Sequence, residues 1–496
     1  MRSLMARYDV APSEAPTGGG SLRWNKVESR SIDYVPLSER HGRLTDQFTI
    51  WFAGSAMLLS LATGVIGIGL GLNLIWTLIA LAVGTFLGTL PVAAHASQGP
   101  HLGLPQMIQS RPQFGRYGAL FIWVVAFAVY WGYVVLDVNL FGPTATQVVG
   151  GSRPVWAIVI GLISMVITIF GYHWMHAGQR WVTVVLVVVL AVYAVGILTG
   201  GELPAGALSL STGFQFAPFF MVMSAALAYQ LSWAFFVSDY SRYMPPTTSH
   251  RAIIFFTASG AGLGVFSMEA VGAVGAALFP SESVTVALAE SGDTVFNGLG
   301  TIVLLVGGLA LVVFNAMCIY GGALTAITAL DSLRPVAPTH RVRTGAIVAV
   351  GVTATLVGAF LPDDFIGTTF YTILAVLAYL MGPWTAINLT DYFLVRRGRY
   401  SITEIFNPNG MYGRWHAAGI VAYVLGFVVM VPFMYLSFYE GFAAKWLNDV
   451  DIAFFVGIPV AAIVYYALSR NLDLDNERAV IRQADAHLEE LGEPIE

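Results

Sequence analysis

Twelve apolar segments constrain this chain more than any other feature, because each is long enough to cross a bilayer. A helix needs about 20 apolar residues to span ~30 Å of hydrocarbon. Charged residues make up 11% of the chain, against roughly 25% in a soluble domain. We therefore predict an all-α integral membrane protein with twelve transmembrane helices. The predicted spans are 47–71, 74–97, 117–148, 154–172, 180–199, 214–239, 252–279, 299–330, 342–361, 368–394, 416–437 and 452–469.

The distribution of Lys and Arg predicts how the spans are oriented. With the N-terminus in the cytoplasm, all 24 basic residues except Arg153 and Lys445 fall on the cytoplasmic side, as the positive-inside rule requires. Both termini are thus predicted to be cytoplasmic in a multi-pass protein of the cell (plasma or inner) membrane. The predicted outer loops carry acidic residues instead, namely Glu282, Glu290, Asp293, Asp363 and Asp364.

Several function classes find no support in the sequence. The net charge of −5 gives no reason to expect a nucleic-acid partner, and the single cysteine, Cys318, excludes an intrachain disulfide. There is no HExxH, Cys cluster or nucleophile elbow, so we predict neither an enzyme nor a metal or cofactor site. A channel would need a charged ring or a carbonyl filter, and no such motif is visible. The first 46 residues show no secretory signal peptide.

Two spans are interrupted at positions five helices apart. The first span is rich in glycine, and the sixth contains the polar stretch YQLSWAFFVSDYSRY over 229–243. Irregular backbone at membrane depth survives only where it lines a cavity or faces protein. Paired interruptions favour an inverted-repeat transporter with its site near the midplane. The alternative for the glycines is that they only allow close helix packing.

Five motifs in order resemble the purine/cytosine permease branch of the nucleobase:cation symporter-1 family, and they extend from about Glu28 to about Tyr400. They are DYVPLSERHGRLTDQFTIWFAG, GPHLGLPQMIQSRPQFGRYG, SWAFFVSDYSRYMP, NAMCIYGGALTAITALDS and GPWTAINLTDYFLVRRGRY. The resemblance implies the leucine-transporter fold, a 5+5 inverted repeat with broken helices 1 and 6 and two peripheral helices. Family members import a nucleobase or related heterocycle with Na⁺ or H⁺ by alternating access.

This fold implies five regions. Residues 1–46 would form a cytoplasmic N-terminal segment, disordered over 1–22. Residues 47–199 and 214–394 would be the two repeats, and 416–469 the peripheral pair. Residues 470–496 would form a cytoplasmic tail with a solvated or surface-lying helix, more passive than regulatory.

A flat heterocycle needs aromatic faces for stacking and a few polar groups for its edge. Trp233 is the expected stacking residue, with an interfacial anchor as the alternative. Gln230 has the hydrogen-bonding groups for an amide edge, but it is equally suited to joining two helices. In span three, the family pattern of an aromatic residue followed by an amide fits either Trp131 with Val135 or Tyr133 with Asp137.

The pairing of Tyr133 with Asp137 is preferred because it keeps a polar group four residues after the aromatic residue. Asp137 is then an acid where the family has Asn or Gln. An ionisable residue at this depth is a functional candidate, and we predict that it carries the coupling proton. The alternative is a carboxylate closer to the outer surface.

In span eight, the resemblance makes Asn315 the site asparagine. Sodium-coupled relatives carry hydroxyl residues just before it, whereas this chain has Val313 and Phe314. Because Na⁺ prefers oxygen ligands, the sodium site is predicted to be impaired. Cys318 replaces a further family Asn, and Ser55 borders the break in span one.

Other polar residues have structural alternatives. Glu269 in span seven is either paired with a neighbour or a second proton carrier, and His95 is predicted to be structural. Gate or packing ion pairs are predicted at the cytoplasmic helix ends, among Asp239, Arg242, Asp391, Arg396 and Arg397.

The leading hypothesis is an H⁺-coupled symporter that imports a nucleobase such as cytosine, a purine or uracil. The alternative is a Na⁺-coupled symporter of a related ring, such as allantoin, a hydantoin, thiamine or another vitamin. Besides substrate and cation, the lipid bilayer is the only expected partner.

Overall fold

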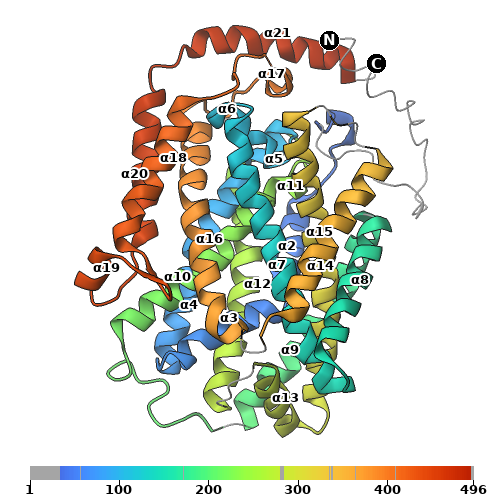
Figure 1. The fold of residues 1–496 in the computed structure, drawn as a ribbon, viewed down its shortest axis with the longest axis vertical. Helices are drawn as coiled ribbons and strands as arrows, with labels where there is room; N and C mark the ends of the chain where they lie inside the picture. Colours follow the sequence, from blue (N-terminus) through green and yellow to red (C-terminus); the bar gives the residue numbers. More distant parts are fainter. Residues whose placement is uncertain are drawn as a thin grey trace.

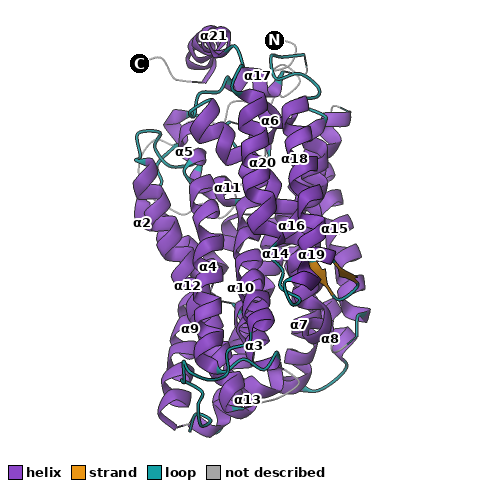
Figure 2. Ribbon diagram, turned by 90° about the vertical axis from the view of Figure 1, so that its left-hand side faces the viewer, coloured by secondary structure: helices purple, strands orange, loops and turns teal. Residues whose placement is uncertain are grey.

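Helices make up most of the described residues and run up and down one bundle (Figure 1). The computed structural model describes residues 34–492 except 56, 171, 201, 280–283, 335, 337–338, 363–364 and 408. The predicted disorder of 1–22 therefore lies outside the described residues. The helices are η2 Leu37–Glu39, α2 Leu44–Ser55, α3 Leu58–Gly69, α4 Leu74–Ala96, α5 Gln98–Leu102, η3 Ile108–Ser110, α6 Arg111–Phe114, α7 Gly118–Val149, α8 Arg153–Phe170, α9 Tyr172–Gly200, α10 Phe216–Leu231, η4 Ser232–Phe235, α11 Val237–Ser241, α12 His250–Leu278, α13 Val284–Val295, α14 Leu299–Leu333, α15 His340–Phe360, α16 Phe365–Thr390, η5 Asp391–Val395, α17 Ile402–Phe406, α18 Ala417–Met430, η6 Val431–Phe433, α19 Phe442–Trp446, α20 Ala453–Ser469 and α21 Leu474–Gly492. One hairpin joins β1 Tyr435–Leu436 to β2 Tyr439–Glu440 (Figure 2).

Each predicted apolar segment coincides with a helix or a broken helix. Among the described residues, eight helices are long and apolar enough to cross a membrane, and α20 with the start of α21 is a further, bent candidate. Shorter apolar helices occupy Leu58–Gly69, Val184–Gly200 and Ala417–Phe433. The two longest predicted spans are single helices, α7 and α14.

The helices form two packed groups with a flanking set. In the first group, α12 packs on α2, α3 and α4, and α10 packs on α4. In the second, α14 and α15 pack on α7 and α8. The helices α16, α18 and α20 pack on one another at the side. The two broken helices belong to the first group, and the break in helix 6 contacts α7 and α14 of the second group through Ser232 and Trp233.

The two ends of the bundle differ. The helices α21 and α17 lie at one end and α13 at the other (Figure 1), and we call these the α21 end and the α13 end. The predicted tail helix is confirmed as α21, which turns by 84° from α20 and lies across its end of the bundle (Figures 1 and 2).

One segment differs from the prediction. The region 280–298, expected as an acidic outer loop, contains the 12-residue helix α13. Tertiary contacts stabilise this short helix: Tyr193 Oη on α9 lies 2.6 Å from Ser291 Oγ. The Asp293 carboxylate accepts hydrogen bonds from the backbone N–H groups of Gly298 and Gly300, at 3.0 Å each.

Candidate functional site

Helix 1 is broken, as predicted, between Ser55 and Leu58. Helix α2 ends at Ser55 and α3 begins at Leu58, with Met57 extended between them at φ −142° and ψ 162°. The break exposes backbone carbonyls that need new donors. Ser60 Oγ donates to the Ser55 carbonyl at 2.8 Å, and Ser55 Oγ donates to the Trp51 carbonyl at 2.6 Å. The hydroxyl of Ser55 therefore stabilises the end of α2.

Helix 6 is broken over the polar stretch that the sequence singled out. Helix α10 ends at Leu231, the 3₁₀ turn η4 follows, and Phe236 leaves the helical region at φ −140° and ψ 5° before α11. Ser232 Oγ donates to the Tyr229 carbonyl at 2.6 Å. Both predicted breaks are thus confirmed, and each is held by local hydroxyl groups.

An aromatic cluster gathers at the two breaks; it consists of Trp51, Tyr133, Trp233, Phe236 and Phe314. The Trp233 ring lies 5.6 Å from Trp51 and 5.4 Å from Phe314, measured between centroids. Phe236 lies 5.3 Å from Trp233, and Tyr133 lies 6.0 Å from Phe314. The cluster therefore joins α2, α7 and α14 to the broken segment that follows α10. Aromatic rings at such spacings form apolar faces on which a flat ligand can stack.

Unpartnered polar groups accompany the cluster. Asp137 and Asn315 are both fully buried at 0% exposure, and neither side chain has a hydrogen-bond partner within the described chain. The Trp233 indole N–H also lacks one. Asp137 follows Tyr133 by one turn of α7, so the two side chains share one face of that helix. The Asp137 side chain is fully enclosed by protein, and its depth in the membrane stays a prediction.

A hydroxyl network ties these helices together. Tyr133 Oη on α7 and Ser232 Oγ in η4 are 2.6 Å apart. Tyr229 Oη on α10 and Ser60 Oγ on α3 are 2.8 Å apart. The two tyrosine rings are in edge contact at 6.3 Å. Helix 3 is therefore joined to helix 6, and helix 6 to the second half of helix 1.

The structure separates the two registers proposed for helix 3. Tyr133 and Asp137 lie with the cluster, whereas the Trp131 indole N–H donates to Thr353 Oγ1 on α15 at 3.1 Å. Trp131 is thus directed to α15 and is not brought to the cluster. Gln230 is fully buried and donates to Thr89 Oγ1 on α4 at 2.6 Å. This contact joins two helices, which is one of the two roles that the sequence allowed for Gln230. Its carbonyl oxygen has no partner in the described chain.

Residues before Asn315 are apolar, as expected, and help to form the cluster. Val313 is buried, and the Phe314 ring packs on both Trp233 and Tyr133. Neither side chain has an oxygen to offer a cation. Cys318 is buried on the same helix.

Trp51 is the cluster residue that sequence reasoning missed. Its ring makes edge contacts with Trp233 and with Tyr240 at 5.5 Å, and its N–H donates to Gln47 Oε1 at 3.3 Å. The available signal was its position four residues before Ser55, on the same face of a helix that ends at the break.

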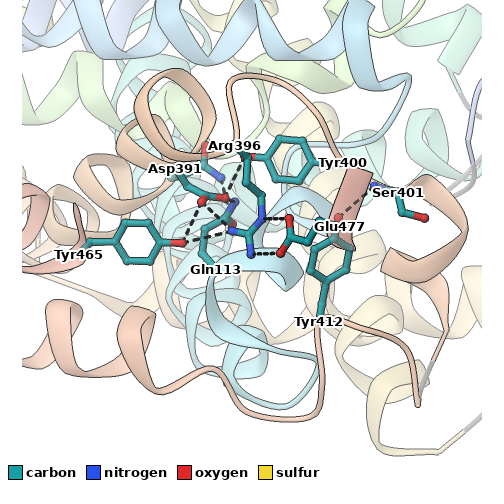
Figure 3. Close-up of polar contacts among 9 residues, drawn as sticks. Gln113, Asp391, Arg396, Tyr400, Ser401, Tyr412, Tyr465 and Glu477 are labelled. Carbon is teal, nitrogen blue, oxygen red and sulfur yellow. Dashed lines mark hydrogen bonds and ion pairs between the residues drawn. The ribbon is translucent and has the colours of Figure 1, made fainter. Parts of the chain in front are cut away.

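The α21 end contains a buried charged cluster (Figure 3). Arg396 Nη1 lies 2.6 Å from Asp391 Oδ1, and both side chains are almost fully enclosed. Arg396 also donates two hydrogen bonds to Glu477 of α21, each at 3.0 Å. Asp391 accepts further hydrogen bonds from Gln113, Tyr400 and Tyr465, at 2.7, 2.9 and 2.9 Å.

Arg396 is the cation of this cluster and faces two carboxylates, Asp391 and Glu477. Burial works against the Arg396 charge, but Asp391, Tyr465 and Glu477 together raise the pKa of Arg396 well above its ordinary value. The predicted ion pair between Asp391 and Arg396 is confirmed, and its role in a gate stays a prediction. Arg397 lies beside it in the left-handed region at φ 53°.

The same end holds the other predicted structural groups. Asp239 Oδ1 accepts from the Gln106 backbone N–H at 2.7 Å, and the Arg242 guanidinium lies 5.1 Å from the Tyr243 ring centroid. His95 stacks on Trp384 with centroids 4.8 Å apart, as expected of a structural residue.

The sequence of this chain is similar to those of known membrane permeases. A family profile described as "Permease for cytosine/purines, uracil, thiamine, allantoin" matches residues 34–457. A putative purine-cytosine permease, YxlA, of Bacillus subtilis is 33% identical over 90% of this chain and 96% of its own length. The purine-cytosine permease FCY22 of Saccharomyces cerevisiae is 26% identical over 88% of this chain and 85% of its own.

Solved structures show the same fold. An inward-facing structure of Mhp1 superposes with a TM-score of 0.71 at 18% identity, over 95% of this chain and 99% of Mhp1. A closed form of Mhp1 with bromovinylhydantoin bound, described as a nucleobase-cation-symport-1 family transporter, gives 0.72 at 17% identity, over 92% and 97%. The chain therefore belongs to the nucleobase-cation-symport-1 family of membrane permeases and has the leucine-transporter fold.

Proposed function

We propose that this protein is a secondary active transporter that imports a nucleobase, such as cytosine, a purine or uracil, by alternating access. The observation that carries the proposal is the set of unpartnered groups on Asp137, Asn315 and Trp233 beside two broken helices. A buried polar group without a partner costs free energy, so a ligand that satisfies these groups binds favourably. The purine-cytosine permeases among the relatives support this substrate class.

In this proposal the ring stacks on Trp233 and its polar edge binds Asn315. Tyr133, Cys318 and Ser55 lie around the same breaks as packing or minor polar contacts. Trp131 and Gln230 are directed to other helices, so we give them no direct role in stacking. The chain lies in the cell membrane with the α21 end in the cytoplasm, the orientation that the basic residues predict.

The coupling cation is proposed to be H⁺. Val313 and Phe314 supply no side-chain oxygen for Na⁺, while two enclosed carboxyl groups, Asp137 and Glu269, are available to bind protons. Protonation changes the charge of a carboxyl group without requiring a coordination shell. Asp137 is the carboxyl that would sense the substrate, because it lies with the aromatic cluster.

Uptake by purified protein in proteoliposomes tests both parts. Labelled cytosine is offered under an imposed pH gradient or an imposed Na⁺ gradient, and competition is measured with uracil, adenine, hypoxanthine, allantoin and thiamine. We expect saturable accumulation driven by the pH gradient and competed by nucleobases. Accumulation that follows Na⁺ and ignores pH would reject H⁺ coupling, and competition by allantoin or thiamine alone would favour the related-ring alternative.

A further inference from the structure

The proposed substrate contacts do not involve Glu269 of α12, so this acid needs another explanation. Its side chain is fully buried between helices. Oε2 accepts a hydrogen bond from Thr85 Oγ1 on α4 at 2.5 Å, whereas Oε1 has no partner in the described chain. The Glu269 backbone lies directly against Gly64 of α3, where a Cβ would come within 1.9 Å of the Glu269 carbonyl oxygen. This acid is therefore enclosed at the contact between α12, α4 and the second half of broken helix 1.

A directional hydrogen-bond chain runs from this acid along α4. The Thr89 hydroxyl donates to the Thr85 carbonyl at 2.7 Å. Because its hydrogen is used there, Thr89 Oγ1 can only accept from Gln230, whose Nε2 lies 2.6 Å away. This fixes the amide orientation of Gln230, with its nitrogen toward Thr89 and its oxygen directed away. The Gln230 carbonyl oxygen is then a second acceptor without a donor.

Protonation would turn Glu269 Oε1 from an acceptor without a donor into a donor. Thr85 and Thr89 are one turn apart on the same face of α4, where such neighbours are about 5–6 Å apart. The side chains that they bind, Glu269 and Gln230, are therefore brought toward each other. A hydrogen on Glu269 Oε1 would supply the missing donor, and an unpaired buried carboxylate would cost several kcal/mol.

No cation is placed to compensate this carboxylate among the described side chains of the helices packed on α12. The titratable groups there are tyrosines engaged elsewhere, acids, and groups at helix ends. Tyr229 binds Ser60, and Tyr193 binds Ser291. The others are Asp46 at the start of α2, His95 at the end of α4, Glu290 and Asp293 on α13, and His250 and Arg251 at the start of α12 itself.

Tyr229 connects this acid to the aromatic cluster. Its ring contacts Tyr133, and its hydroxyl group bonds to Ser60 on α3, one turn before the Gly64 that packs against the Glu269 backbone. The contact that encloses Glu269 and the residue that joins the two broken helices therefore lie on neighbouring turns of α3.

We propose that Glu269 is a second proton-binding site of the transport cycle, and that its protonation controls the packing of broken helices 1 and 6 instead of substrate affinity. The protonated form bridges to Gln230 and holds α3, α4, α10 and α12 together. The unprotonated form loses this bridge and lets helix 1 move. The proposal rests on the proposed H⁺ coupling.

The test is Glu269→Gln in proteoliposomes, because glutamine mimics a permanently protonated side chain. Exchange of labelled for unlabelled cytosine needs only the loaded, protonated carrier, so we expect exchange and cytosine affinity to stay within about threefold of wild type. Net accumulation needs the empty carrier to return without its proton, and we expect it to fall by about tenfold or more. Glu290→Gln, the same change at an exposed position on α13, is the matched control.

The possible outcomes distinguish a failure of the proposed H⁺ coupling from a failure of the Glu269 proposal. If the wild type shows no pH-driven accumulation, the proposed coupling fails before the variant is considered. If the wild type accumulates cytosine and Glu269→Gln does so equally well, the Glu269 proposal is overturned. If Glu269→Gln loses both cytosine binding and exchange, Glu269 is a folding or substrate-binding residue. That result would also overturn the Glu269 proposal. A scintillation proximity binding assay on detergent-purified protein supplies that binding measurement.

Discussion

Asp137, Asn315 and Trp233 share a property that is rare in folded proteins, since each is buried and carries polar atoms without a hydrogen-bond partner. Most buried polar groups are paired. Trp233 lies in the broken segment of helix 6, and Asp137 and Asn315 lie on α7 and α14, whose side chains contact that segment. A ligand with a flat face and a polar edge is the simplest partner for such a set.

Trp233→Ala and Asn315→Ala are each expected to weaken binding of the transported nucleobase by about tenfold or more, a loss of about 1.4 kcal/mol or more. The first removes a stacking face, and the second removes the hydrogen bonds to the ring edge. Equilibrium binding of labelled nucleobase to purified protein measures both. Trp131→Phe is the control, because Trp131 is directed to α15; equal losses in the control and in Trp233→Ala would place the site elsewhere.

Asp137→Asn is expected to retain nucleobase binding and lose accumulation driven by a pH gradient. The amide keeps the shape and hydrogen-bonding capacity of the side chain but cannot exchange a proton. Because Asp137 lies with the aromatic cluster, we also expect the Kd of this variant to stop changing with pH. A pH series of binding measurements checks this, and unchanged pH-driven accumulation would remove Asp137 from the coupling role.

At the scale of elements, close packing of the glycine-rich half of helix 1 explains only some of its glycines. A Cβ at Gly64 would collide with the Glu269 backbone, and one at Gly67 would lie 2.5 Å from Thr77. Gly69 has open space around it. The packing alternative raised by the sequence is therefore correct for Gly64 and Gly67 and not for Gly69, although all three lie in α3.

Gly64→Ala is expected to destabilise the protein by about 1–3 kcal/mol, because the added methyl group overpacks the contact between α3 and α12. Gly69→Ala, on the same helix, is expected to be neutral or to stabilise by about 0.5–1 kcal/mol, since alanine is the better helix former. Unfolding of the two variants in detergent, followed by circular dichroism, measures the difference. A Gly64→Ala protein as stable as Gly69→Ala would contradict the observed packing.

Glu477 of α21 joins this helix to the bundle through two hydrogen bonds to Arg396. Glu477→Gln is expected to remove about 1.5–3 kcal/mol of charge-assisted hydrogen bonding with Arg396, so α21 should be released and cleaved faster by protease. Arg396 would keep its pairing with Asp391, so the rest of the bundle should stay folded. Asp475→Asn serves as control, because its pair with Arg478 is exposed and worth at most about 1 kcal/mol; equal protease sensitivity would show that Glu477 does not anchor the helix.

At the scale of the whole molecule, the two packed groups meet at the broken helices, and polar contacts gather at the α21 end. Gln98 on α5 donates to Asn388 on α16 at 2.8 Å. Gln113 on α6 donates to Asp391 in η5 at 2.7 Å. Gln106 joins the same region to α11 through Asp239. A motion that opens this end would have to break these contacts between elements distant in sequence.

Cysteine labelling tests which end faces the cytoplasm. The native Cys318 is buried, so a cysteine-free Cys318→Ala background should keep the fold. We expect Trp446→Cys on α19, where the native side chain is 78% exposed, to react with a membrane-impermeant maleimide in intact cells. Asp475→Cys on α21 should react only after the cells are permeabilised. The reverse pattern would overturn the orientation predicted from Lys and Arg.

The sequence by itself determined the membrane class, the position of each span and the location of both breaks. These features depend on apolar length and on polar residues within a span, which are local properties of the chain. Trp233 and Tyr133 were expected at the site and lie in one aromatic cluster with Phe314, whereas the placement of Asp137 and Asn315 at the site stays a prediction.

The tertiary structure decided which side chains face each other, because direction within a helix bundle depends on the neighbours and not on the residue type. Trp131 and Tyr133 are two positions apart and equally aromatic, yet the first contacts α15 and the second joins the cluster. Gln230 was a possible site residue until Thr89 on α4 supplied its partner. Trp51 and the helix α13 became apparent only through contacts with distant segments, Trp233 and Tyr193, whose proximity no local pattern encodes.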